Sequence, residues 1–165
     1  MDALKEYTLY AFAIGFGATM VMDLWGIFAA RVLKFPPPNY ALVGRWIGTM
    51  PQGRFVHSGI AQSPPIAGER IIGWAAHYFI GIVFAGLLLS VNGIAWAHNP
   101  TLLPALGIGL LTLVAPFFVM QPGMGAGIAA SRTPNPTQAR LRSVLTHFVF
   151  GAGLYSAAQA ATVLL

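Results

Sequence analysis

Apolar residues run through this chain in long stretches, separated by segments that hold most of the proline and the charge. The stretches cover residues 7–30, 71–91, 102–120 and 144–165. Each is close to the roughly 20 residues that cross about 30 Å of hydrocarbon as a helix. The pattern predicts an all-α integral membrane protein with four transmembrane helices, organised as a single membrane domain over residues 1–165.

The composition supports this prediction. Hydrophobic residues make up 56% of the chain and charged residues only 8%, whereas soluble domains carry about a quarter charged residues. The first residues lack the positive region of a secretory signal, and the first apolar stretch contains Asp23, so we expect a retained first helix. Cysteine is absent, which excludes a disulfide or a thiolate metal site and leaves the redox compartment open.

The positive charge lies around the predicted connections 31–70 and 121–143, and the connection between them, NGIAWAHNP, has none. The positive-inside rule makes both charged loops cytoplasmic and both termini periplasmic in a bacterial inner membrane. This placement argues against a nucleic-acid partner. We interpret the arginines as topological signals and as contacts to anions or lipid headgroups, the candidates being Arg45, Arg70, Arg132, Arg140 and Arg142.

A short motif occurs twice: HYFIG at residues 77–81 returns seventy positions later as HFVFG at 147–151. The match extends upstream, where Arg70 lies over Arg140. Two helix pairs related by an axis along the membrane normal would form a parallel repeat, as in some transporters. The alternative is chance similarity between apolar helices. A real repeat predicts that His77 and His147 face one axis.

Polar residues within the predicted spans share one depth. Asp23 lies roughly 12 Å before the first loop arginine, and each histidine lies roughly 10 Å after its own arginine. An ionisable group at this depth is costly against lipid, so Asp23 should face the interior and needs a partner. The segment 121–130 is either a broken helix or a re-entrant turn. The predicted layer consists of Asp23, His77, Gln121 and His147.

Small or polar residues recur at every fourth position along three of the predicted helices. Such stripes are surfaces along which membrane helices approach closely, within one chain or between copies. They predict packing seams and favour a homo-oligomer. The stripes are Ala11, Gly15, Thr19 and Asp23; Glu69, Gly73, His77 and Gly81; and Ser143, His147, Gly151, Tyr155 and Gln159.

The motifs exclude several enzyme classes. The sequence has no glycine-rich phosphate loop, no HExxH and no Ser-His-Asp order with a nucleophile elbow, so the enzyme question stays open and leans towards no activity. We expect a four-helix bundle whose cytoplasm-facing cleft, lined by the polar layer and fringed by Glu69, binds or passes a small polar or anionic solute. Asp23 and a histidine would exchange a proton.

Two other functions stay open at this point. One is a haem or metal carrier with His77 and His147 as ligands, because two histidines on facing helices can hold a haem from both sides. The other is a lipid-headgroup enzyme whose loops lie at the interface. Without such a group, no cofactor or metal is predicted, and the partners are membrane lipid, further copies of the chain and the solute.

Five segments together resemble a known family. They are MDLWG (22–26), LVGRWIG (42–48), GERIIGWAAHYFIG (68–81), LLPALGIG (102–109) and MQPGMGAGIAASRTPNPTQARLRS (120–143). They are similar to a bacterial family of small four-span inner-membrane proteins known only as a domain of unknown function. The resemblance covers nearly the whole chain. It implies the membrane location and the four helices, and it supplies no activity, substrate or cofactor.

Overall fold

The computed structural model describes residues 2–165, and over these residues the chain is all-helical with no strand. Short 3-10 turns and one π-helical turn join the longer helices. In chain order the elements are α1 (Ala3–Val32), α2 (Tyr40–Thr49), η1 (Met50–Gln52), η2 (Ile60–Gln62), α3 (Glu69–Asn92), α4 (Ala95–His98), α5 (Leu102–Leu111), η3 (Pro116–Met120), α6 (Gln121–Gly123), η4 (Ile128–Ala130) and α7 (Pro136–Leu164).

Contacts divide the chain into two compact units. Unit 1 contains the chain up to Pro37 together with Tyr78–Thr112 and Leu145–Leu165, and unit 2 contains Pro38–His77 and Leu113–Val144. Unit 1 therefore holds most of the long helices, and unit 2 holds the two predicted charged loops. The two units are described separately below.

Three helices are long and apolar enough to cross a membrane: Ala3–Val32, Glu69–Asn92 and Leu102–Gly123. They correspond to the first three predicted spans. The first is longer than expected, because the side chain of Asp2 accepts a hydrogen bond from the backbone N–H of Leu4 and caps the helix ahead of the apolar stretch. These helices are compatible with a membrane protein.

Helix α7 begins earlier than the predicted span 144–165. It starts at Pro136, where a missing N–H costs nothing, and the side chain of Asn135 accepts a hydrogen bond from the backbone N–H of Gln138. The expectation that residues 121–143 form a loop throughout was therefore wrong for the last part. Arg140 and Arg142 lie in the first turns of α7.

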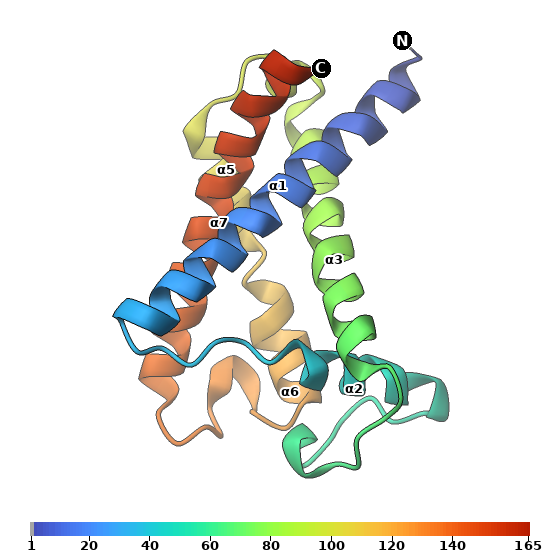
Figure 1. Cartoon of the computed structure of the whole chain (residues 1–165), viewed down its shortest axis with the longest axis vertical. Coiled ribbons are helices and arrows are strands. Elements are labelled where there is room, and N and C mark those ends of the chain that lie inside the picture. Colours follow the sequence, from blue (N-terminus) through green and yellow to red (C-terminus); the bar gives the residue numbers. More distant parts are fainter. Residues whose placement is uncertain (1) are drawn as a thin grey trace. The chain divides into compact units, whose positions relative to one another are not determined.

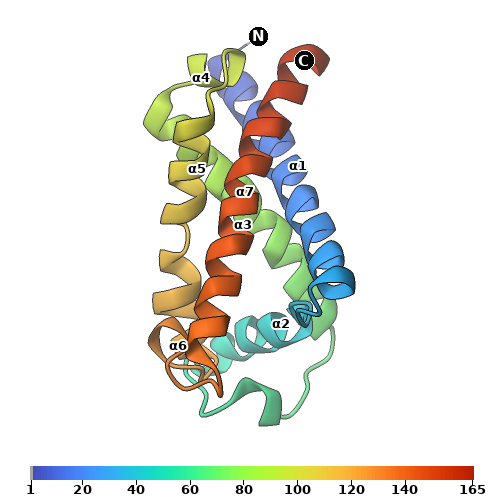
Figure 2. The same ribbon diagram turned by 90° about the vertical axis from the view of Figure 1, so that its left-hand side faces the viewer.

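Within unit 1, the long helices run beside one another (Figures 1 and 2). They approach closely at glycines. Gly15 of α1 lies so close to Gly81 and Ile82 of α3 that a Cβ at Gly15 would overlap their backbone. Gly109 of α5 approaches Gly151 of α7 in the same way. Each of the three predicted stripes thus contains a glycine at which two helices approach closely.

The core of unit 1 is built from residues of five elements, α1, α3, α4, α5 and α7. Ile14, Leu88 and Leu154 are among its fully buried side chains. At the end of unit 1 where α1 starts and α7 finishes (Figure 2), His98 of α4 binds Glu6 of α1 through Nε2 and Oε1 at 2.8 Å. This hydrogen bond fastens α4 to α1.

Helix α5 ends before the predicted span does. Regular α-helix stops at Leu111, and a π-helical turn, η3, follows at Pro116–Met120. Because Pro116 has no N–H, it cannot donate to the carbonyl of Thr112 one turn earlier. π-helical turns are frequent at functional sites. The third span is thus a helix interrupted at Thr112, next to candidate site residues.

Unit 2 contains more structure than its proline-rich sequence indicated. Asn39 caps α2 by accepting from the N–H of Ala41, and the indole N–H of Trp46 donates to the carbonyl of Phe55 at 2.8 Å. A Cβ at Gly44 would overlap the carbonyl oxygen of Glu69, so α2 lies directly against the start of α3. The first connection is a folded element and positions its arginine.

Candidate functional site

Asp23 of α1 lies in unit 1 opposite Tyr78 of α3. The Tyr78 hydroxyl donates to Asp23 Oδ2 at 2.9 Å, and both side chains are half-buried. One turn earlier, the Thr19 hydroxyl donates to the carbonyl of Gly15 where α1 meets Gly81. The stripe that ends at Asp23 therefore faces α3, and the carboxylate accepts a hydrogen bond from a phenol within a candidate span.

His147 of α7 is hydrogen-bonded at the interruption of the third span. Its Nδ1 lies 2.8 Å from the Thr112 hydroxyl and 3.3 Å from the carbonyl of Gly109, and the Thr112 hydroxyl lies 2.6 Å from that same carbonyl. If the hydroxyl donates to Gly109, it must accept from Nδ1–H. This assignment leaves the lone pair of the His147 ring on Nε2, which can take up a proton or accept a hydrogen bond.

His77 has different surroundings from His147, although the repeat pairs the two residues. It lies in unit 2, stacked on the ring of Tyr40 with centroids 4.1 Å apart, and meets Trp74 edge-on at 5.8 Å. His147 belongs to unit 1 and contacts a threonine hydroxyl. His77 thus packs against two aromatic rings, whereas His147 is hydrogen-bonded to a hydroxyl.

Gln121 begins α6 in unit 2 and carries an unsatisfied acceptor. Its Nε2 donates to the Ser143 hydroxyl at 3.5 Å, while Oε1 is buried and has no hydrogen-bond partner among the described residues. A buried amide oxygen without a donor is costly and calls for an additional donor from water or a ligand. This atom is the clearest sign of an unfilled polar position near the predicted layer.

Arg45 and Glu69 form a bidentate ion pair in unit 2, with Nε–Oε2 and Nη2–Oε1 distances of 2.8 and 2.9 Å. Nη1 of Arg45 donates to the carbonyls of Ile60 and Ser63. The hydrogen bond with Glu69 raises the pKa of Arg45 above its ordinary value, against the opposing effect of burial. The charged groups of Arg45 and Glu69 thus bind each other. Contacts of either residue with a solute or a lipid headgroup stay predictions.

A comparison with known protein families gives a match over most of the chain. The model of a family described as a protein of unknown function (DUF2938) matches residues 12–161 of the chain. The chain belongs to this family. The resemblance seen in the sequence is thereby confirmed, and the DUF2938 match covers every residue of the predicted layer. No curated protein and no solved structure matches the chain.

The remaining arginines of this DUF2938 protein lie around unit 2. Arg70 and Arg132 are exposed, and Arg140 donates through Nε to the carbonyl of Ala129 at 2.8 Å. Ala129 has a left-handed backbone with φ 47°, so Arg140 supports an unusual turn. Arg142 is half-buried on α7. Contacts of these residues with anions or headgroups stay a prediction.

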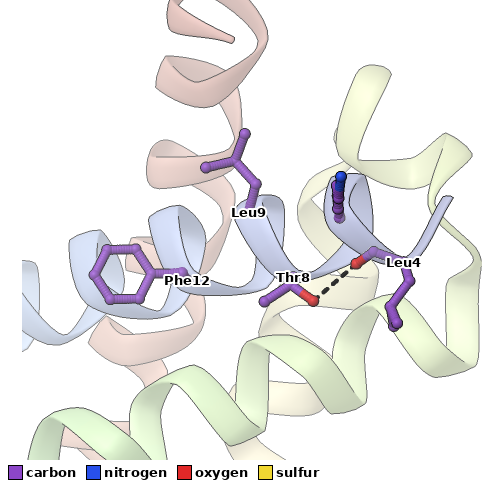
Figure 3. Close-up of a pocket in the computed structure, with 5 residues that line it drawn as sticks. Leu4, Thr8, Leu9 and Phe12 are labelled. Carbon is purple, nitrogen blue, oxygen red and sulfur yellow. Dashed lines mark hydrogen bonds between the residues drawn. The ribbon is translucent and has the colours of Figure 1, made fainter. Parts of the chain in front are cut away.

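A shallow apolar groove lies on the first turns of α1 (Figure 3). It has a volume of about 510 Å³. The Thr8 hydroxyl donates a hydrogen bond to the carbonyl of Leu4 at 2.8 Å, so its hydrogen is not available to a molecule in the groove. Such a surface suits a lipid chain better than a polar solute. Its lining residues are Leu4, Lys5, Thr8, Leu9 and Phe12.

Sequence reasoning on this DUF2938 chain missed the hydroxyl and aromatic partners of the layer. Tyr78 directly follows His77, and Thr112 lies in an otherwise apolar run, so neither stood out. One indication of these partners was present in the sequence: a polar group within a membrane span needs a hydrogen-bond partner. Over the described residues, no three His, Cys, Asp or Glu side chains gather around a metal position. Haem ligation by the two histidines stays a prediction.

The ion pair of unit 2 gives a first prediction. Arg45→Met should lower the melting temperature by several degrees, because it leaves Glu69 partly buried without its bidentate partner. Arg45→Lys should also destabilise, since an ammonium cannot reproduce the fork and the two carbonyl contacts. The double variant Arg45→Met/Glu69→Leu should recover part of the loss. Thermal melts of the detergent-purified variants check this, and a double variant less stable than Arg45→Met would contradict it.

Proposed function

We propose that this protein is a four-span membrane protein of the bacterial inner membrane that binds or passes a small polar or anionic solute in exchange for a proton. The observation that carries the proposal is the hydrogen bond between Asp23 and Tyr78. An ionisable side chain inside a candidate span is rare and usually functional. A tyrosine hydroxyl holds the carboxylate in place and still permits it to take up a proton.

Two further observations support the same function. His147 has a ring nitrogen with a free lone pair beside the interruption of the third span, and such breaks in transporters expose backbone carbonyls to ions and substrates. Gln121 Oε1 requires a donor that the described residues do not supply. Within unit 1, the carboxylate of Asp23 and the imidazole of His147 are suited to bind a solute that carries both acceptor and donor groups.

The membrane arrangement in this proposal follows the charge pattern. Helix α7 provides the fourth span: its 29 residues reach about 43 Å, enough to cross the hydrocarbon despite its polar first turns. The arginine-rich connections 31–70 and 121–143 face the cytoplasm and both termini face the periplasm. Lipid surrounds the exposed apolar side chains of α1, such as Phe12, Phe16 and Leu24. Further copies of the chain complete the path, since four helices rarely enclose one.

The paired glycines are consistent with a parallel repeat. Gly81 and Gly151 occupy matching positions of the seventy-residue alignment, and each lies at the closest approach to the preceding span, at Gly15 and Gly109 respectively. A twofold relation between the α1–α3 and α5–α7 pairs would produce this pattern. The different partners of His77 and His147 indicate that the two halves have diverged at the histidines.

The test separates charge from shape at Asp23. Asp23→Asn retains an acceptor for Tyr78 and should fold normally, whereas Asp23→Leu removes the acceptor of the Tyr78–Asp23 hydrogen bond and should cost about 1–3 kcal/mol of stability. Proteoliposomes with a trapped pH dye are exposed to inorganic phosphate, acetate, succinate or glycine. We expect one of these solutes to accelerate proton entry in the wild type, and Asp23→Asn to slow it at least about tenfold.

Tyr78→Phe serves as the matched control because it removes the same hydrogen bond without touching the carboxylate. It should lower stability while retaining solute-dependent proton entry. Equal proton entry in the wild type and in folded Asp23→Asn would reduce the Asp23–Tyr78 contact to a packing interaction and remove the basis of the proposal.

A further inference from the structure

Three side chains of unit 2 form a hydrogen-bonded chain that the polar layer does not include. His57 Nδ1 lies 3.1 Å from the hydroxyl oxygen of Ser63, and His57 Nε2 lies 3.1 Å from that of Thr49. Thr49 is buried, while His57 and Ser63 are half-buried. A serine, a histidine and a third group that orients the ring are the elements of an activated nucleophile.

The hydrogen-bond directions follow from the surroundings of Thr49. Its hydroxyl lies 2.9 Å from the carbonyl of Trp46 and 3.1 Å from that of Arg45, and it has one hydrogen to donate to them. Its oxygen then accepts from His57 Nε2–H. The lone pair of the neutral ring is on Nδ1, facing Ser63. Ser63 therefore donates to His57, as a serine does before its proton is removed by a base.

The backbone holds this arrangement in place. The N–H of His57 donates to the carbonyl of Gly123 at 2.8 Å, and the N–H of Ile60 donates to the carbonyl of Met124 at 3.0 Å. On the other side, Arg45 donates to the carbonyl of Ser63 at 2.7 Å. Base and nucleophile are thus fixed by contacts independent of their own hydrogen bond, which is the preorganisation that nucleophilic catalysis needs.

We propose that Ser63 and His57 form a hydrolytic site for carboxylic esters, with Thr49 as a positioning residue. The Ser63 oxygen attacks the ester carbonyl as its proton passes to His57 Nδ1. The bond to the alcohol then breaks, and the alcohol leaves with that proton, giving an acyl-Ser63. Water attacks the acyl group, again losing a proton to His57, and the acid departs as Ser63 regains its proton. The site is separate from the Asp23 layer.

One local feature limits the expected rate. Pro64 follows Ser63 and has no N–H, so the residue after the nucleophile cannot donate to the oxyanion. Loss of one such donor slows other hydrolases about 10²–10³-fold. Covalent capture of the nucleophile is therefore a better primary readout than turnover.

The experiment treats the detergent-purified protein with a fluorophosphonate probe, which forms a stable Oγ–P bond to an activated serine with loss of fluoride. Peptide mass spectrometry should locate the adduct on Ser63. Ser63→Ala should abolish labelling, and His57→Gln should slow it about 100-fold. Ser58→Ala, five residues away in the same exposed segment, should label as the wild type does. Circular dichroism and gel filtration confirm that each variant is folded.

The positioning role of Thr49 has its own readout. Thr49→Ser retains the hydroxyl and should label nearly as fast as the wild type, whereas Thr49→Val should label about tenfold more slowly. A purely structural role for the three residues predicts lower melting temperatures and no adduct in any variant. Absence of an adduct on Ser63 in the folded wild type, or an undiminished rate in His57→Gln, overturns the proposal.

Two substrates distinguish the source of the ester. p-Nitrophenyl butyrate tests a water-soluble ester, and phosphatidylglycerol vesicles with a fluorogenic acyl chain test a membrane glycerolipid. If only p-nitrophenol is released faster than by Ser63→Ala, the substrate is a water-soluble ester. If the fluorogenic acyl chain is released faster than by Ser63→Ala, the substrate is a membrane lipid. Release no greater than that background in both arms overturns the hydrolytic reading. Asp23→Asn should leave labelling unchanged, so failure here and failure of the solute proposal are distinguishable.

Discussion

Gly15→Ala should lower the free energy of unfolding by about 1–3 kcal/mol, although it adds a single methyl group. The new Cβ would overlap the Cα of Ile82 and the carbonyl oxygen of Gly81, both backbone atoms of α3 that no side-chain rotation can move aside. Helices α1 and α3 would have to separate at their crossing. That separation would also strain the hydrogen bond from Tyr78 to Asp23, two turns along α1.

Gly107→Ala is the matched control for this substitution. Gly107 also lies in a candidate span, but a Cβ there meets no atom within 4 Å. Because alanine is the better helix former, this variant should be neutral or up to about 1 kcal/mol more stable. Thermal melts of both variants in the same detergent measure the difference. Equal stability of the two would mean that α1 and α3 do not touch at Gly15.

Gly125→Ala should be strongly destabilising in unit 2, because it combines an unfavourable backbone conformation with an overlap against backbone. Gly125 has φ 92°, outside the range that a residue with a Cβ readily adopts, and its Cβ would lie 2.6 Å from the carbonyl oxygen of Ser58. The backbone conformation costs about 1–2 kcal/mol and the overlap about 1–3 kcal/mol more. We expect a loss of stability together with slower labelling of Ser63, because the segment that carries His57 packs against Gly125.

Gly53→Ala separates the two causes. Gly53 also has a left-handed backbone, with φ 77°, but a Cβ there meets no atom within 4 Å. It should therefore show only the conformational cost and label at the wild-type rate. Circular dichroism melts and fluorophosphonate labelling of the two variants give the comparison. If Gly53→Ala and Gly125→Ala lose the same stability and label alike, residues 57–58 do not pack on Gly125.

The long helices could be predicted from the sequence because their signal is local. Hydrophobic runs near 20 residues mark spans wherever the rest of the chain lies, and three of the four are long apolar helices in the structure. The spacing of Gly15, Thr19 and Asp23 also placed these residues on one face of a helix. The structure adds that this face meets α3 at Gly81.

The partners within the site were harder to predict because each lies far away in sequence. Asp23 and Tyr78 are separated by 55 residues, and His147 and Thr112 by 35. One residue's step along a helix turns the side chain by about 100°, so periodicity alone cannot tell whether His77 or its neighbour Tyr78 reaches the acid. The interruption of α5 follows from Pro116, which the apolar run concealed.

The folded first connection was missed for a different reason. Residues 31–70 show little apolar periodicity, and their prolines indicated an irregular loop. This region is stabilised by individual contacts that follow no periodic pattern. They are an ion pair between a buried arginine and a glutamate, and close backbone contacts at glycines. Such pairings depend on the folded positions of both partners, so they leave no repeating pattern in the chain.

The two sets of contacts in unit 2 also become available at different times during synthesis. The Arg45–Glu69 pair joins residues 24 positions apart, so it can form soon after Glu69 emerges from the ribosome. The bond from His57 to Gly123 needs the third apolar segment to have been made as well. A nascent chain would thus hold Ser63 by its carbonyl before His57 is anchored. The proposed ester site would therefore gain its backbone anchor at Gly123 only after the third apolar segment has been made.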